Sequence, residues 1–183
     1  GPQKQMPSTL SIALATAWSG QAKTATILLN AGATVEAGAF NGFRFSPLHL
    51  AASNPSTPLK VIKLLLEQTV HQIDTNEPVR VADAKGQVAR ALALFSRVPW
   101  LAPPPVRKGL QVVGCTALHF AAAAGSVDVI RTLVRGGAST ALVNAYGETP
   151  HDVARRMFGV VHPAIVAALA DEVSSLPSQT LPS

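Results

Sequence analysis

The stretch GCTALHFAAAAGSVDVIRTLVRGGAS, residues 114–139, decides the fold of this chain. A turn glycine precedes Thr116-Ala117-Leu118-His119, and a break at Gly125-Ser126 separates this opening from a second apolar run. In that run the apolar side chains recur at helical spacing and share one face: Val129, Ile130, Leu133 and Val134. Glycine ends helices because it adopts a left-handed conformation without steric cost. The stretch therefore predicts two short helices, the second ending at Gly136-Gly137.

The same opening occurs twice more. Thr149-Pro150-His151-Asp152 repeats it in altered form, with its threonine 33 positions after Thr116. Upstream, Ser46-Pro47-Leu48-His49 is another copy. Self-similarity at a fixed period is typical of repeat architectures, in which each unit buries its apolar face against its neighbours.

These units resemble the ankyrin-repeat family. Residues 114–139 match its pattern closely, FSPLHLAA with VIKLLLEQ is a second match, and NAYGETPHDVA opens a further unit. The resemblance implies an all-α fold, a solenoid of helix pairs with hairpin loops, four or five repeats and an irregular middle segment. We expect the domain over 8–172, between a tag remnant or linker at 1–7 and a disordered tail at 173–183. The expected repeats lie near 8–40, 41–75, 111–143 and 144–172, with 76–110 either degenerate or inserted.

The middle segment leaves two interpretations open. Residues 83–89 could be the degenerate turn and opening of a repeat, which would lead into a first helix at 91–95. Alternatively, residues 69–110 form an insertion outside the stack. Residues 99–105, with four prolines, cannot continue a helix, since proline lacks the donor and clashes with the preceding turn.

The resemblance assigns structural roles to the residues of the openings: Ser46, His49, Thr116, His119 and Thr149. Their hydroxyl and imidazole groups are expected to satisfy backbone groups at the turn and helix start and to join neighbouring repeats. An unpaired buried polar group costs roughly 1–3 kcal/mol, so such bonding is required. Both histidines are therefore interpreted as structural groups, not as bases or ligands.

The resemblance also implies a partner-binding surface at the hairpin tips and inner helices. The candidate binding residues are Phe43, Phe45, Asn54, Lys85, Trp100, Val112, Val113, Tyr146 and Arg156. Aromatic side chains are typical binding anchors. For Phe43 and Phe45 the alternative is that they pack under the middle segment. Trp100 could pin that segment to the stack or anchor a partner.

The net charge of +5 arises in residues 79–110, where six basic residues face Asp83 alone. This excess could attract an acidic or peptide-like partner over long range. The alternative is a solvated loop whose charges keep it in solution. Direct nucleic-acid binding is disfavoured, since the basic residues are not interleaved with stacking aromatics.

Catalysis and cofactors are not expected. The histidines and acids are scattered instead of grouped as metal ligands, and neither a Gly-x-Ser-x-Gly elbow nor a phosphate-binding loop is present. The single cysteine, Cys115, excludes an intrachain disulfide. No apolar run has the ~18 residues of a membrane span. We therefore expect no enzyme, cofactor, metal, small-molecule substrate or membrane span, and a cytoplasmic or nuclear location.

Two functions follow from this sequence. The first is a non-enzymatic protein–protein interaction module. The second is a regulatory or targeting domain cut from a larger enzyme or membrane protein. Binding of an acidic partner through residues 79–110 is a further hypothesis, and it predicts a steep loss of binding as salt rises.

Overall fold

The computed structural model of the chain describes residues 23, 24, 27, 38–40, 43–72, 74–81 and 111–170. Three helix pairs account for most of them. The first pair is α3 (Pro47–Ser53) with α4 (Leu59–Gln72), the second α7 (Ala117–Ala124) with α8 (Val127–Arg135), and the third α9 (Pro150–Phe158) with α10 (Pro163–Ala170). The predicted break at Gly125-Ser126 is present between α7 and α8.

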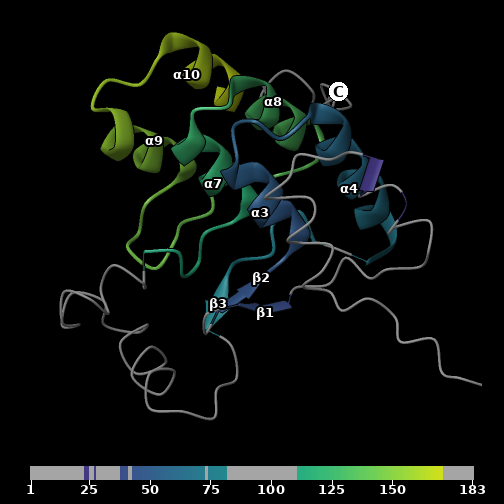
Figure 1. Cartoon of the computed structure of the whole chain (residues 1–183). Helices are drawn as coiled ribbons and strands as arrows, with labels where there is room; N and C mark the ends of the chain where they lie inside the picture. Colours follow the sequence, from purple (N-terminus) through teal and green to yellow (C-terminus); the bar gives the residue numbers. More distant parts are fainter. Residues whose placement is uncertain are drawn as a thin grey trace, which may run out of the picture.

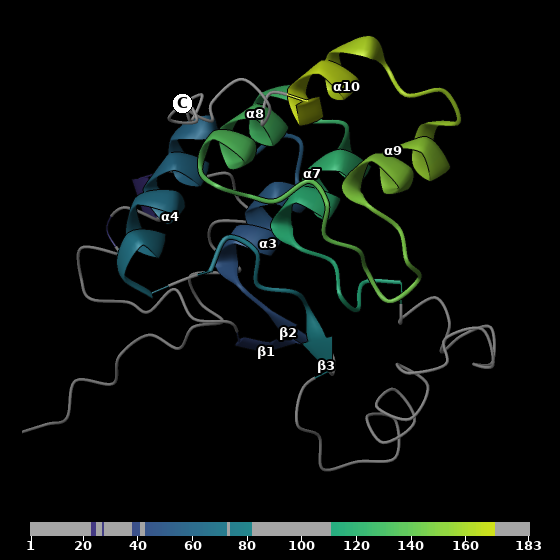
Figure 2. The ribbon, with the colours of Figure 1, turned by 180° about the vertical axis from the view of Figure 1, so that it is seen from behind.

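The three pairs stack side by side in two rows. In the inner row α3 packs against α7, and α7 against α9; in the outer row α4 packs against α8, and α8 against α10 (Figure 1). The reverse view shows the same two rows from behind (Figure 2). Because α3 and α7 are in direct contact, the stack of these three described pairs is continuous.

Each inner helix begins at a polar residue that the sequence repeats. Ser46, Thr116 and Thr149 are the N-cap residues of α3, α7 and α9, and all three have extended backbone angles. After α7 the chain turns at Gly125, which has a φ of 70° and therefore suits glycine. Its N–H satisfies the carbonyls of Ala121 and Ala122 at the helix end.

Small and branched apolar side chains fill the space between the rows. Leu48, Leu118, Ile130 and Leu133 are essentially inaccessible, and alanines of α3 and α7 lie between them. The alanines let the inner helices approach closely, which explains how a chain with few aromatic residues builds a dense core. The predicted buried face of α8 has its four residues in this core.

The structure also contains a small antiparallel sheet, which the expectation of an all-α fold did not include. Its strand order is β1 (Gly38–Phe40), β2 (Phe43–Phe45), β3 (Arg80–Val81). Phe40 pairs with Phe43 at the hairpin, and Phe43 with Val81 across the other edge. The sheet lies beside α3 on the side of the hairpin loops (Figure 1).

Backbone hydrogen bonds of one pattern close the hairpins of the next two units. The Val79 N–H donates to the Cys115 carbonyl at 2.9 Å, and the Gly114 N–H donates to the Val79 carbonyl at 2.8 Å. The next unit has the matching bonds: the Asn144 N–H donates to the Glu148 carbonyl, and the Gly147 N–H donates to the Asn144 carbonyl. Val79 thus corresponds to Asn144 and Gly114 to Gly147.

Residues 80–113 stand between Val79 and Gly114, where the following unit has only residues 145 and 146. The segment that the sequence leaves as a degenerate repeat or an insertion, 76–110, lies outside the described residues from residue 82 onward.

None of the helices in the described ranges is both long enough and apolar enough to cross a membrane.

Candidate functional site

His49 joins its own helix to the following hairpin. Its Nδ1 accepts the Ser46 N–H at 3.0 Å, and the Ser46 hydroxyl lies 2.6 Å from the same nitrogen. On the other side of the ring, Nε2 lies 2.9 Å from the Glu77 carbonyl. Since a carbonyl can only accept, the network assigns the proton to Nε2 and leaves Nδ1 as an acceptor.

His119 repeats this arrangement in the next unit. Its Nδ1 accepts the Thr116 N–H at 3.0 Å, and its Nε2 lies 3.1 Å from the Glu148 carbonyl. Each imidazole therefore bridges a helix start and the hairpin of the next unit. The two rings fix the spacing between the hairpins.

Both histidines are held in the neutral form. Burial lowers the pKa of His49 from 6.5 to about 4, an effect that the hydrogen bond to Glu77 only partly offsets. Burial also lowers the pKa of His119. Protonation would place a second hydrogen on Nδ1, where a backbone donor already points, so the neutral tautomer suits the geometry.

At the start of α9, in the third helix pair, Asp152 takes the place of these histidines, and the sequence-based interpretation did not include its role. Its Oδ2 accepts the Thr149 N–H at 3.1 Å and the Thr149 hydroxyl at 2.6 Å. These bonds lower the pKa of the Asp152 carboxyl. The signal was available, because an acid at this helix position is the usual second half of a capping box.

An aromatic cluster lies between the first two pairs, on the hairpin side. The Phe45 ring is 6.0 Å from Phe120 and 6.2 Å from Phe43, and His49 contacts both Phe45 and Phe120 edge-on. Phe43 is buried, so it does not present a surface anchor in this structure. Phe45 and Phe120 are half-buried.

Val112 and Val113 complete an apolar patch at this place. Both are half-buried and pack against the cluster of Phe43 and Val79. We call Phe45, Val112, Val113 and Phe120 the apolar patch. The structure brings together three of the predicted binding residues here, and adds Phe120, which the sequence analysis did not select.

The third helix pair and the hairpin before it share a polar group. Arg156, on α9, pairs with Glu148 at 2.6 Å. The Asn144 amide donates to the same carboxylate at 2.9 Å. Burial raises the pKa of Glu148, but the hydrogen bonds from Arg156 and Asn144 outweigh this effect and lower it. Arg156 is therefore held in place instead of extending freely.

The remaining predicted binding residues are dispersed. Tyr146 is half-buried at the tip between Asn144 and Gly147, and Asn54 is half-buried at the C-cap of α3. Lys85 and Trp100 lie outside the described residues.

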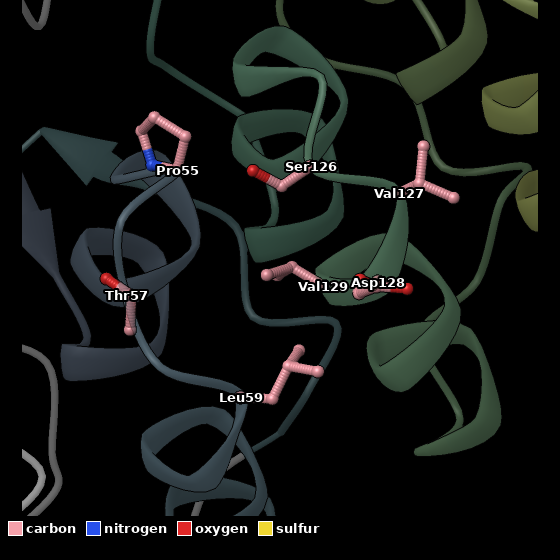
Figure 3. A pocket seen from close by; sticks show the side chains of 7 residues that line it. All are labelled: Pro55, Thr57, Leu59, Ser126, Val127, Asp128 and Val129. Atoms are coloured by element: carbon pink, nitrogen blue, oxygen red, sulfur yellow. The ribbon is translucent and has the colours of Figure 1, made fainter.

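The described part of the stack has hollows elsewhere. One of about 380 Å³ is bounded by Pro78, Thr116, Leu142 and Asn144 beneath the hairpins. The other, of about 220 Å³, lies between the α3–α4 connection and the start of α8, where the Ser126 hydroxyl points toward Pro55 (Figure 3). Neither brings titratable groups together for a reaction.

Within the described ranges, no group of three or more His, Cys, Asp or Glu residues is placed to hold a metal ion. Cys115 is a free, buried thiol, and burial raises its pKa to about 11. Such a thiol is a poor nucleophile, since the reactive form is the thiolate.

The family model of the ankyrin repeat matches residues 113–145. This segment is similar to an ankyrin repeat. The match covers the end of the interrupted hairpin, α7, α8 and the chain leading to Asn144, and the helix pairs on either side of this repeat stack against it. An ankyrin repeat indicates a protein–protein interaction module. No sequence among the curated proteins matches the chain significantly.

Proposed function

We propose that this chain is a non-enzymatic module that binds another protein through its hairpin tips and the adjoining surface of the inner helices. The observation that carries the proposal is the apolar patch of Phe45, Val112, Val113 and Phe120. These four side chains are half-buried and lie at the junction of two hairpins and α7. The ion pair of Arg156 with Glu148 borders the next hairpin.

Two physical features favour binding at this place. An apolar centre with polar groups around it is the usual composition of a protein interface. The histidine bridges also hold the hairpins in a fixed arrangement before any partner arrives. Preorganised loops lose less conformational entropy on binding, so more of the contact energy appears as affinity.

A peptide library displayed on phage tests the proposal, because it presents many partner sequences to the chain at once. Binders are selected on the immobilised chain, and their affinity is then measured for the double variant Val112→Ala with Val113→Ala. We expect a loss of about tenfold or more, because apolar contact area at the centre of the interface is removed.

The matched control is Val160→Ala with Val166→Ala. These valines, 88% and 41% exposed, lie in the α9–α10 region and offer the same chemical change outside the proposed surface. Binders that respond to the control pair and not to Val112 and Val113 would contradict the proposal. Thermal melting of both variants establishes that the fold is retained.

A further inference from the structure

We infer that the hollow beneath the hairpins binds a large aliphatic side chain from an uncharged, extended segment of the partner protein. The inference rests on the proposed function and adds the chemistry of the partner. The hollow has a volume of about 380 Å³ and lies where the chain after α8 passes the preceding hairpin. It meets the apolar patch at the step from Val113 to Gly114 but shares none of its four residues.

Hydrogen bonds at both ends fix the walls of the hollow. The Asn76 amide donates to the Gly137 carbonyl at 3.2 Å, and its oxygen accepts the Ser139 N–H at 2.7 Å. Further along, the Ala145 N–H donates to the Val113 carbonyl at 3.0 Å. The chain between these two links borders the hollow, so the walls are in place before a ligand arrives. Such preorganisation lowers the entropic cost of binding.

The lining of the hollow selects against charged side chains. All of its residues are uncharged: Asn76, Pro78, Gly114, Thr116, Leu142, Val143, Asn144 and Ala145. Asn144 already donates to the Glu148 carboxylate and accepts the N–H groups of Tyr146 and Glu148. That carboxylate is itself paired with Arg156. A charged group entering the hollow would therefore lose water without gaining a partner, which is costly.

Apolar side chains at the rim favour an aliphatic occupant. Leu142 and Val143 line the hollow and are 39% and 53% exposed. Covering them removes apolar surface from water, which favours binding in proportion to the area buried. None of the lining residues is aromatic, so the hollow offers no ring on which a nucleobase could stack. These features favour a peptide over a nucleic acid.

The backbone of the same two residues supplies the polar part of the site. Within the described part of the chain, the N–H and carbonyl groups of Leu142 and Val143 make no hydrogen bond. An extended segment can pair with free backbone groups, as strands do when they add to the edge of a sheet. Successive side chains of an extended segment point in opposite directions, so one of them enters the hollow and its neighbours point away.

The test uses the full chain, isotope-labelled for NMR, and a capped tripeptide with leucine between two serines. The peptide is titrated to about 10 mM, a range in which millimolar dissociation constants are measurable. We expect the backbone amide signals of Leu142, Val143 and Ala145 to shift. Peptides with lysine or glutamate in place of leucine should bind at least about tenfold more weakly, since the lining offers a charge no partner.

Matched variants locate the binding. Leu142→Ala with Val143→Ala should weaken binding of the leucine peptide about tenfold, because apolar contact area is lost. Val160→Ala with Val166→Ala removes exposed apolar side chains in the α9–α10 region and should change it less than about twofold. Thermal melting of both variants checks that the fold is retained.

Two further samples test the charge preference and the backbone pairing. Val143→Lys brings a charge to the lining, so it should weaken the leucine peptide and strengthen the glutamate peptide. Methylation of the leucine nitrogen removes a backbone donor and should also weaken binding. The inference is overturned by equal binding of the leucine and lysine peptides, by equal losses in the two alanine variants, or by a lack of shifts at Leu142 and Val143.

The two proposals fail independently. If phage-selected peptides require Val112 and Val113 but the leucine peptide does not shift the signals of Leu142 and Val143, only the hollow is wrong. If the leucine peptide binds in the hollow and the selected peptides do not respond to Val112 and Val113, only the proposed surface is wrong.

Discussion

Helices α7 and α9 both begin at a threonine, but the side chain three residues later is a histidine in α7 and an aspartate in α9. In both, a threonine caps the helix and the residue three positions later accepts the threonine N–H. His119 then extends beyond its own unit to the Glu148 carbonyl. Asp152 has only carboxylate oxygens, which accept and do not donate, and its described hydrogen bonds all remain with Thr149.

The difference separates two functions of one sequence position. Capping a helix requires an acceptor alone, and either side chain supplies it. Joining two units requires an acceptor on one side and a donor on the other, and of these two side chains only the neutral imidazole provides both. The aspartate is therefore sufficient for a helix start, whereas the histidine also holds the following hairpin.

The largest difference between the two openings should appear one residue before the histidine. Leu118 is fully buried, while His151 occupies the matching position and is half-buried. Leu118→Ala should lower the free energy of unfolding by about 2–5 kcal/mol through the cavity it leaves. His151→Ala should change it by less than about 0.5 kcal/mol, as at other surface positions. Equal effects in chemical denaturation would show that the two units are not in the proposed register.

Acid should weaken the histidine bridges before it affects the aspartate cap. The folded pKa of His49 is about 4 against 6.5 in the unfolded chain, so only the unfolded chain takes up a proton in this interval. The contribution of His49 to the free energy of unfolding is therefore fully present above pH 6.5. It is lost as the pH drops toward 4, and the loss amounts to about 3 kcal/mol. Denaturation measured across this interval checks the sign and size.

Two variants show whether the loss of stability between pH 6.5 and 4 comes from His49. His49→Gln should flatten the fall between pH 6.5 and 4, whereas a change of the exposed His162 to Gln should leave it intact. The lowered pKa of Asp152 places the loss of its contribution at still more acid pH, below 3.8. A wild-type stability that stays constant over the upper interval would contradict a buried neutral imidazole.

A shorter acceptor at position 119 should measure what the hydrogen bond between His119 and the Glu148 carbonyl contributes to stability. His119→Asn retains an oxygen that can accept the Thr116 N–H but is too short to serve the Glu148 carbonyl as well. We expect a loss of about 1–3 kcal/mol, the cost of an unpaired buried polar group. Asp152→Asn is the matched change in the other opening and should cost less. Equal losses of stability in His119→Asn and Asp152→Asn would contradict a stabilising bond between His119 and the Glu148 carbonyl.

A smaller effect is expected for removal of the aspartate in the capping box of α9. Asp152→Ala should cost about 0.5–1.5 kcal/mol, since it removes an acceptor of hydrogen bonds from Thr149. Since Thr149 and Asp152 act as one hydrogen-bonded unit, the double variant with Thr149→Ala should cost less than the sum of the single variants. Strict additivity in thermal or chemical melting would argue against the capping box.

The helices were predictable where the sequence is periodic. The openings at Thr116 and Thr149, the break at Gly125 and the apolar face of α8 can all be read from local spacing, because capping and burial depend on residues a few positions apart. The pairing of β2 with β3 could not be read in this way. It joins short strands that precede and follow α3 and α4 in the chain, and strands of two or three residues carry no periodic signal.

The candidate surface was only partly predictable for the same reason. Phe45, Val112 and Val113 were selected from their places relative to the repeat openings. For Phe43 the sequence left open a surface anchor or a packed side chain, and the side chain is buried in a cluster with Val79. That contact joins residues far apart in the chain.

The interrupted hairpin has a consequence for engineering the chain. Val79 and Gly114 are joined by a 2.8 Å backbone hydrogen bond, so the sequence between them begins and ends at nearly the same point. Doubling the length of such a closed loop costs only about 0.6 kcal/mol. A complete foreign domain whose own termini lie close together can therefore be grafted between these two residues, which makes the hairpin an entry point for building fusion sensors.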